Sequence, residues 1–173
     1  MDRGVQAGDV IKVGKHIELE CLDTPGHTYC HICLCAHAEQ PALFSGDTLF
    51  NAGAGNVHNG GDVNALFSSF TEQLMRLPDN TRIYPGHDYL DTNLKFTLAR
   101  EPNNAAAQSR LARVVDHDPA LAMVTTLAQE KEHNTFMRLQ SPELIEQLRI
   151  NFPDMHAEPD VQTVFKHLRT LRN

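Results

Sequence analysis

The pattern of apolar residues changes near residue 100, and this change limits the fold more than any other feature of the chain. Before residue 100, short apolar segments of strand length are separated by turns that contain glycine or proline. After it, apolar residues recur every three or four positions, which is the spacing of one face of a helix. We therefore predict an α/β (α+β) chain in two parts, with a sheet in residues 1–100 and helices in residues 101–173.

Turn and capping residues set the boundaries of the expected elements. Gly14 divides residues 9–22 into two short strands, and Asp62 is the expected N-cap of the first helix, because its carboxylate can accept hydrogen bonds from backbone N–H groups. Further strands are expected within residues 29–37, 41–47 and 81–88. Helices are expected at residues 63–77, 93–100, 102–115, 127–138, 142–150 and 161–171.

The charge balance narrows the classes of partner. The chain has 15 Lys and Arg residues against 22 Asp and Glu residues, which gives a formal net charge of -7. This balance argues against nucleic acid as a partner, since phosphate binding needs a basic face. No apolar run reaches the roughly 18 residues of a transmembrane helix, and the first residues lack the apolar segment of a signal peptide. We therefore expect a cytoplasmic protein without a membrane partner.

Cys30 and Cys33 form a C-x-x-C pair, a spacing that can bind metal. The surrounding segment is rich in β-compatible apolar residues, and residues three apart on a strand point to opposite faces of a sheet. No second C-x-x-C pair follows at the spacing of a zinc ribbon. We therefore expect both cysteines to be small apolar core residues rather than metal ligands.

Three polar turns follow strand-like segments, and each presents one residue that can bind a metal. His27 lies in TPGHT, Asp47 in SGDT and His87 in PGHDY. Loops at the ends of adjacent strands meet at one edge of a sheet, so we expect these side chains to converge. Two imidazoles and a carboxylate suit Zn²⁺, Fe²⁺ or Mn²⁺, and a carboxylate can bridge two ions. The 10 histidines of the chain are an enrichment that also suggests metal chemistry.

The motifs TPGHT, SGDTLF and PGHDY occur in this order, and they are followed by NLKF and then LAQEKEHNTFMR. Together they resemble the metallo-β-lactamase superfamily, and most closely its glyoxalase II branch, the hydroxyacylglutathione hydrolases. The resemblance covers nearly the whole chain.

The resemblance implies a binuclear metal site at the edge of an αββα sandwich. His27 would bind the first metal, Asp47 would bridge both, and His87 would bind the second, with zinc expected and iron or manganese as alternatives. Tyr89 would help to hold glutathione. A metal-bound hydroxide would attack the carbonyl of a glutathione thioester, and the metals would stabilise the oxyanion.

The C-terminal segment adds two expected substrate contacts. Residues 161–173 contain Lys166, Arg169 and Arg172 and no acidic residue. This local positive charge in an acidic chain suits an anionic thiol such as glutathione, so we expect Arg169 and Arg172 to contact the substrate. The alternative is that these residues form the solvated face of an amphipathic helix.

One motif of the family is absent from this sequence. THxHxDH, which supplies four of the family's metal ligands, does not occur, and no two histidines lie two positions apart. The chain thus resembles the second half of the sandwich followed by the helical glyoxalase II-like domain, as in a truncated enzyme, and we expect it to hold fewer metals than the family does, or none. A missing half would expose apolar strand faces, so we also expect a homodimer or aggregate formed through that surface.

Two alternatives stay open on the sequence. The first is an iron persulfide dioxygenase of the same superfamily, which has a related YPxHDY motif, although the long helical segment after NLKF favours the hydrolase. The second is a truncated, non-catalytic remnant or binding module, which the missing THxHxDH motif supports.

Overall fold

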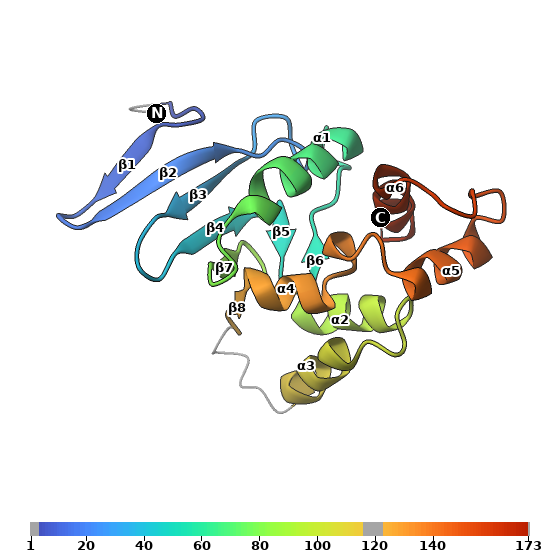
Figure 1. Cartoon of the computed structure of the whole chain (residues 1–173). Helices are drawn as coiled ribbons and strands as arrows, with labels where there is room; N and C mark the ends of the chain where they lie inside the picture. Colours follow the sequence, from blue (N-terminus) through green and yellow to red (C-terminus); the bar gives the residue numbers. More distant parts are fainter. Residues whose placement is uncertain (1–3, 116–122, 173) are drawn as a thin grey trace.

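The computed structural model describes residues 4–115 and 123–172. Figure 1 shows a twisted sheet at one end of the molecule, with α1 lying over it and the remaining helices gathered at the other end. All neighbouring strand pairs of this sheet are antiparallel except β4 and β7, which run parallel. The six strands follow the order β1 (Val10–Val13), β2 (Ile17–Asp23), β3 (Ile32–Ala36), β4 (Ala42–Gly46), β7 (Arg82–Pro85) and β8 (Thr125–Thr126).

A short hairpin and the helices complete the fold. The hairpin pairs β5 (Leu49–Phe50) with β6 (Gly53–Ala54). The first helix continues beyond its regular part as a π-helical segment, Ser69–Gln73, and then a 3₁₀ segment, Leu74–Arg76. The helices are α1 (Val63–Ser68), α2 (Leu90–Leu98), α3 (Ala105–Val115), α4 (Leu127–His133), the 3₁₀ turn Thr135–Met137, α5 (Pro142–Asn151) and α6 (Val161–Arg172). The predicted α/β class is confirmed.

Local side-chain hydrogen bonds explain where α2 begins and where α4 ends. α2 begins at Leu90 rather than at residue 93, because Oδ1 of Asp88 accepts a hydrogen bond from the Leu90 N–H at 3.2 Å. α4 ends at His133 rather than at residue 138, because Asn134 adopts an extended backbone and its side chain caps the following 3₁₀ turn. Local hydrogen bonds therefore shift helix ends that apolar spacing alone places only approximately.

The predictions also missed three strands and misplaced one helix start. β5, β6 and β8 have two residues each, so they are too short to show the alternation that identifies a strand. α3 begins at Ala105 rather than at residue 102, because Oδ1 of Asn104 accepts a hydrogen bond from the Ala107 N–H at 3.0 Å.

One hydrophobic core joins the sheet to the helices. Leu43 and Ile83, on neighbouring strands, are both 0% exposed. On the helical side, the ring centroid of Phe165 in α6 lies 5.4 Å from that of Phe70 and 5.3 Å from that of Phe136. These contacts join segments that are distant in sequence into one cluster. These contacts do not test the boundary near residue 100 between the sheet and helical parts, which stays a prediction.

The cysteine prediction is right for one member of the C-x-x-C pair and wrong for the other. Cys33 is fully buried in β3, and burial raises the pKa of its thiol to about 11, so it is a neutral core residue. Cys30 is exposed and lies in the turn before β3, where strand alternation does not apply. Cys30 is therefore not a core residue.

The sheet face that points away from the helices carries several apolar side chains that are open to solvent. Strand pairing places Leu34, Phe44 and Tyr84 beside one another on this face, where the Phe44 and Tyr84 rings stack at 5.4 Å. Val13 and Ile17 lie on the same face by alternation along β2, and they are 47% and 52% exposed, against 44% for Phe44. We call these five residues the outer face. The expected exposure of apolar strand faces is confirmed.

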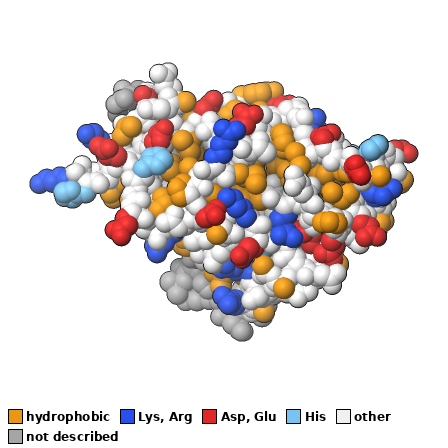
Figure 2. Space-filling view, viewed as in Figure 1, with side chains coloured by type: hydrophobic (Ala, Val, Ile, Leu, Met, Phe, Trp, Pro, Cys, Tyr) orange, Lys and Arg blue, Asp and Glu red, His pale blue; other side chains and the backbone are white. Residues whose placement is uncertain are grey.

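Charged side chains of both signs are mixed over the face of the molecule seen in Figure 2. Figure 2 shows Lys and Arg side chains next to Asp and Glu side chains over most of this view, with apolar side chains between them. Within the described ranges, none of the helices has the length and apolar character needed to cross a membrane.

The N-cap of α1 provides a test of the local structure. Oδ1 of Asp62 accepts hydrogen bonds from the N–H groups of Asn64 and Ala65, both at 2.9 Å. Asp62→Ala removes both bonds and should lower the free energy of unfolding by about 1 kcal/mol, which is a melting-temperature loss of about 3 °C for a chain of this size. Asp62→Asn is the control, because its amide oxygen still accepts. Thermal unfolding by circular dichroism measures both, and equal losses would contradict the capping role.

Candidate metal centre and adjoining cavity

His27, Asp47 and His87 lie together at one edge of the sheet. Each follows a strand, and these strands (β2, β4 and β7) all run in the same direction, so their carboxyl ends meet at this edge. Nε2 of His27 is 3.6 Å from Oδ2 of Asp47, and Nε2 of His87 is 3.5 Å from Oδ1. The structure therefore brings together the three residues expected as metal ligands, and that role itself stays a prediction.

The two imidazoles approach different oxygens of the Asp47 carboxylate. Each carboxylate oxygen therefore has one imidazole nitrogen beside it. In residues 4–115 and 123–172, no group of three or more His, Cys, Asp or Glu side chains forms a cluster that could hold an ion. The described residues thus supply a partial ligand set that is open to solvent, with His87 55% and Asp47 32% exposed at their side chains.

The orientation of His27 fits metal binding. Its Nδ1 lies 2.8 Å from the backbone oxygen of Asn56, and because a carbonyl can only accept, Nδ1 must carry the proton. In the neutral imidazole this leaves the lone pair on Nε2, the atom that points toward Asp47. A second partner that fixes the tautomer in this way is typical of histidines that bind metals.

His31 supports the Asp47 loop from behind. The Asp47 N–H donates to Nε2 of His31 at 3.1 Å, so Nε2 is unprotonated, and Nδ1 lies 2.8 Å from Oγ1 of Thr48. Burial, together with the nearby His27, lowers the pKa of His31, while Asp47 opposes this shift. The neutral ring required by the hydrogen bonds agrees with that direction, so His31 is a hydrogen-bonded structural residue.

Two glycines allow the ligand loops to approach their neighbours closely. Gly26 has a φ of 146°, and a Cβ there would lie 2.4 Å from Cα of Leu66 in α1. A Cβ on Gly86 would lie 2.7 Å from Oδ1 of Asp47. The glycine before His27 therefore lets its loop pack closely on α1, and the glycine before His87 lets its loop approach the Asp47 carboxylate.

A cavity of about 280 Å³ adjoins the metal centre and contains the three residues expected to bind substrate. An aromatic group joins it to the centre, since the ring of Tyr89 stacks on His87 at 5.4 Å and meets the edge of Phe50 at 5.1 Å. The cavity is lined by Phe50, Ala54, Asn56, Tyr89, Asn93, Arg169 and Arg172. A ligand bound there would extend directly from the metal centre.

The two arginines of the cavity differ in their surroundings. Arg169 is 2% exposed and donates hydrogen bonds to the backbone oxygens of Ala54 and Arg172. Burial, with a further contribution from the charge of Arg172, lowers the pKa of Arg169 to about 10, so it still carries its charge at neutral pH. Arg172 is only partly buried and donates to Oδ1 of Asn93 at 3.2 Å. Arg172 is therefore the more accessible cation, and Arg169 adds its charge from the wall of the cavity.

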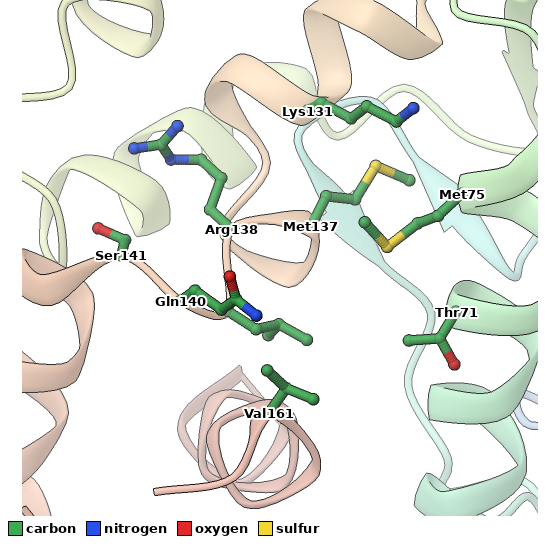
Figure 3. Close-up of a pocket in the computed structure, with 9 residues that line it drawn as sticks. Thr71, Met75, Lys131, Met137, Arg138, Gln140, Ser141 and Val161 are labelled. Atoms are coloured by element: carbon green, nitrogen blue, oxygen red, sulfur yellow. The ribbon is translucent and has the colours of Figure 1, made fainter. Parts of the chain in front are cut away.

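A larger cavity, of about 480 Å³, lies between the helical segment after α1 and the start of α5. Figure 3 shows the thioether side chains of Met75 and Met137 facing into it, with Lys131 at its rim and Arg138 pointing away. Nζ of Lys131 is 2.6 Å from Oδ1 of Asp79, and Nε of Arg138 donates to Oε1 of the buried Glu101 at 2.9 Å. Both cations are thus already paired with carboxylates, and we assign no ligand to this cavity.

Several groups of the site could not be predicted from the sequence. Phe50 reads as part of a short apolar segment, and Asn56 acts through its backbone oxygen, so neither position shows a signal in the sequence. Asn93 lies inside the NLKF motif, which contributed to the resemblance without indicating a role for this side chain.

Two family models together match almost the entire chain. The model described as the metallo-beta-lactamase superfamily matches residues 4–87, and the model described as the hydroxyacylglutathione hydrolase C-terminus matches residues 88–173. The first range contains all three expected metal ligands, and the second contains Tyr89, Arg169 and Arg172.

Curated relatives with the same description are similar over most or all of the chain. Hydroxyacylglutathione hydrolases from Polaromonas sp. and Nitrosococcus oceani are 72% and 60% identical over 173 residues. A protein named hydroxyacylglutathione hydrolase cytoplasmic from Arabidopsis thaliana is 38% identical over 154 residues, which is 86% of this chain and 59% of the relative. The chain covers 66% of the length of each of the first two relatives.

Solved structures show the same fold. ETHE1 from Myxococcus xanthus matches with a TM-score of 0.55 and 26% identity over 98% of this chain and 60% of its own. A metallo-beta-lactamase from Staphylococcus aureus matches with a TM-score of 0.55 and 25% identity over 98% of this chain and 43% of its own. With the family models and the relatives, these matches establish that the chain belongs to the metallo-β-lactamase superfamily and, within it, to the hydroxyacylglutathione hydrolase family.

Proposed function

We propose that this chain forms part of a metal-dependent hydrolase that cleaves glutathione thioesters. The observation that carries the proposal is the direct contact between the candidate metal centre and the cavity. His87 belongs to the centre and stacks on Tyr89, which lines the cavity, at 5.4 Å. A thioester whose carbonyl lies at the centre would therefore have its thiol portion in the cavity.

Each group of residues has a distinct part in this proposal. Divalent ions, when bound, polarise a carbonyl oxygen and lower the pKa of coordinated water. His27, Asp47 and His87 would hold them, with zinc as the proposed metal because two imidazoles and a carboxylate are common ligands of zinc. Tyr89 would pack against the thiol portion of the substrate. Arg172, together with the charge of Arg169, would attract the carboxylates of glutathione.

The length of the relatives bears on what this chain does alone. The chain covers 66% of the two most similar relatives described above, and it lacks the THxHxDH motif that supplies the other ligands in the family. We therefore propose that the described residues bind the thiol portion of the substrate and supply some of the metal ligands. A cytoplasmic location is proposed from the name of the Arabidopsis relative, hydroxyacylglutathione hydrolase cytoplasmic.

Metal binding should depend on the Asp47 carboxylate. We expect the chain to bind Zn²⁺. Asp47→Asn should weaken that binding about tenfold or more, because it removes the negative charge and one of the two oxygens of the carboxylate. Asp91→Asn is the matched control, since it removes the same charge from an exposed residue that pairs only with Lys95 in the described structure. Titration with Zn²⁺ by calorimetry measures both variants. Equal affinities in Asp47→Asn and the unaltered chain would contradict the assignment.

Binding of glutathione should depend on Arg172. The chain should bind S-methylglutathione, and Arg172→Gln should weaken this binding about tenfold, since a charged hydrogen bond contributes about 1.5 kcal/mol. Arg149→Gln, at an exposed position of α5, should have no effect. Binding without hydrolysis of S-lactoylglutathione in the presence of Zn²⁺ would favour the binding-module alternative. Absence of binding by the unaltered chain would contradict the proposal.

The outer face should promote association of the chain with itself. We propose that it forms the contact of a homodimer or larger assembly, because its apolar side chains Ile17 and Phe44 are 52% and 44% exposed. The double substitution Ile17→Lys with Phe44→Lys should shift the chain to monomer. Ile150→Lys is the control, because Ile150 is 69% exposed but lies on α5. Light scattering measures the mass, and a monomeric unaltered chain would contradict this expectation.

A further inference from the structure

The tip of the β5–β6 hairpin is held by side chains from the helical part of the chain. The carboxylate of Glu130 in α4 accepts a hydrogen bond from the Ala52 N–H at 2.8 Å. Nδ2 of Asn134 donates to the backbone oxygen of Gly53 at 3.1 Å. Both side chains are buried, with Glu130 and Asn134 each 0% exposed. Two successive residues of the tip are therefore held by buried groups of α4 and its cap.

The residues on either side of the tip are held in the same way. Nδ2 of Asn93 in α2 donates to the backbone oxygen of Asn51 at 3.0 Å, and the Asn51 amide donates to Oγ1 of Thr125 at 2.6 Å. Nη1 of Arg169 in α6 donates to the backbone oxygen of Ala54 at 2.9 Å. Side chains from α2, β8, α4 and α6 thus fix four consecutive residues of the hairpin.

Glu130 is the charged centre of this arrangement. Its two oxygens accept from the Ala52 N–H, the Thr125 hydroxyl, the Asn134 amide and Nε2 of His133. Burial alone would raise the pKa of Glu130, but the hydrogen bonds and the interaction with His133 outweigh it, so the pKa lies below its usual value. The buried carboxylate is therefore ionised and all four donors have a partner.

The hairpin turn itself is strained. Ala52 has a φ of 57°, the only positive φ among the described non-glycine residues. A residue with a Cβ pays roughly 1–2 kcal/mol in this region, and the conformation persists only where surrounding contacts impose it. The hydrogen bond from the Ala52 N–H to Glu130 is such a contact.

Both ends of the hairpin lead directly into the candidate site. Asp47 precedes it by two residues, and Asn56 follows it by two residues and accepts from Nδ1 of His27. The hairpin residues Phe50 and Ala54 line the cavity that contains Tyr89. The hairpin therefore forms part of one wall of the cavity and lies in the chain between Asp47 and Asn56.

We propose that Glu130 is a positioning residue, which holds the β5–β6 hairpin so that the cavity has the shape needed to bind the glutathione portion of the substrate. The inference rests on the proposed function, because the cavity is assigned to glutathione there. It assigns to the helical part a role in substrate binding beyond the arginines of α6.

Glu101 provides a matched control inside the same helical part. It is also 0% exposed, and its carboxylate accepts from Nε of Arg138 at 2.9 Å and from the Ser141 hydroxyl at 2.7 Å. None of its described partners belongs to the hairpin. Glu101→Gln and Glu130→Gln make the same chemical change in two buried carboxylates, and only the second reaches the hairpin.

The experiment compares these two variants with the unaltered chain by hydrogen exchange and by calorimetric binding of S-methylglutathione. Glu130→Gln replaces the charged acceptor of the Ala52 N–H by a neutral amide, and a hydrogen bond to a neutral acceptor is about half as strong as one to a carboxylate. We expect exchange at Ala52 to rise about tenfold or more and affinity to fall about five- to tenfold in Glu130→Gln. Glu101→Gln should destabilise the chain without either change. Thr125→Val, which keeps the carboxylate but removes its hydroxyl donor, should act in the same direction if Glu130→Gln fails to fold.

Other outcomes separate this inference from the proposed function. Faster exchange at Ala52 in Glu130→Gln with unchanged affinity for S-methylglutathione would overturn the positioning role. Binding of S-methylglutathione to the unaltered chain would still support the proposed function. Equal effects of Glu101→Gln would overturn it as well, because general destabilisation would then explain the loss. Failure of the unaltered chain to bind S-methylglutathione would overturn the proposed function, and this inference would fall with it.

Discussion

The packing of Phe165 against Phe70 and Phe136 is the contact on which the arrangement of the molecule depends. Full burial of each ring contributes about 2 kcal/mol or more, and edge-on contacts between rings add to this. Because Phe165 is on α6, this packing holds the last helix against the sheet-containing part. Arg169 and Arg172, one and two turns further along α6, are thereby brought beside the β5–β6 hairpin.

The candidate metal centre depends on strand direction and on two close approaches. β2, β4 and β7 run in the same direction, so the loops that carry His27, Asp47 and His87 leave the sheet at one edge. Glycine before each histidine lets the loops approach closely, and Asn56 and His31 hold His27 and the Asp47 backbone in place. The candidate site is thus oriented by neighbours outside the expected set of ligands.

Much of this could be predicted from local patterns. The strands from β1 to β4, the capped helix that begins after Asp62 and the helix α6 follow from apolar spacing and capping, which act within a few residues. The three polar turns each show a ligand-type residue beside a glycine, and the order of the motifs indicated the family, which the family models and relatives confirm. Prediction failed for Cys30, which lies in a turn rather than on the predicted strand. It also failed for helix ends that depend on side-chain hydrogen bonds.

The sequence by itself therefore determined the fold class and the family and indicated the residues expected to bind a metal, because these depend on short-range periodicity and on residue chemistry. Only the tertiary structure decided that Phe50 and Asn93 line the cavity, that Asn56 orients His27, and that Glu130 holds the hairpin tip. Ala52 and Glu130 are 78 positions apart, and no local pattern relates them. Such contacts arise from how the helices pack on the sheet, so they become visible only when the chain is folded.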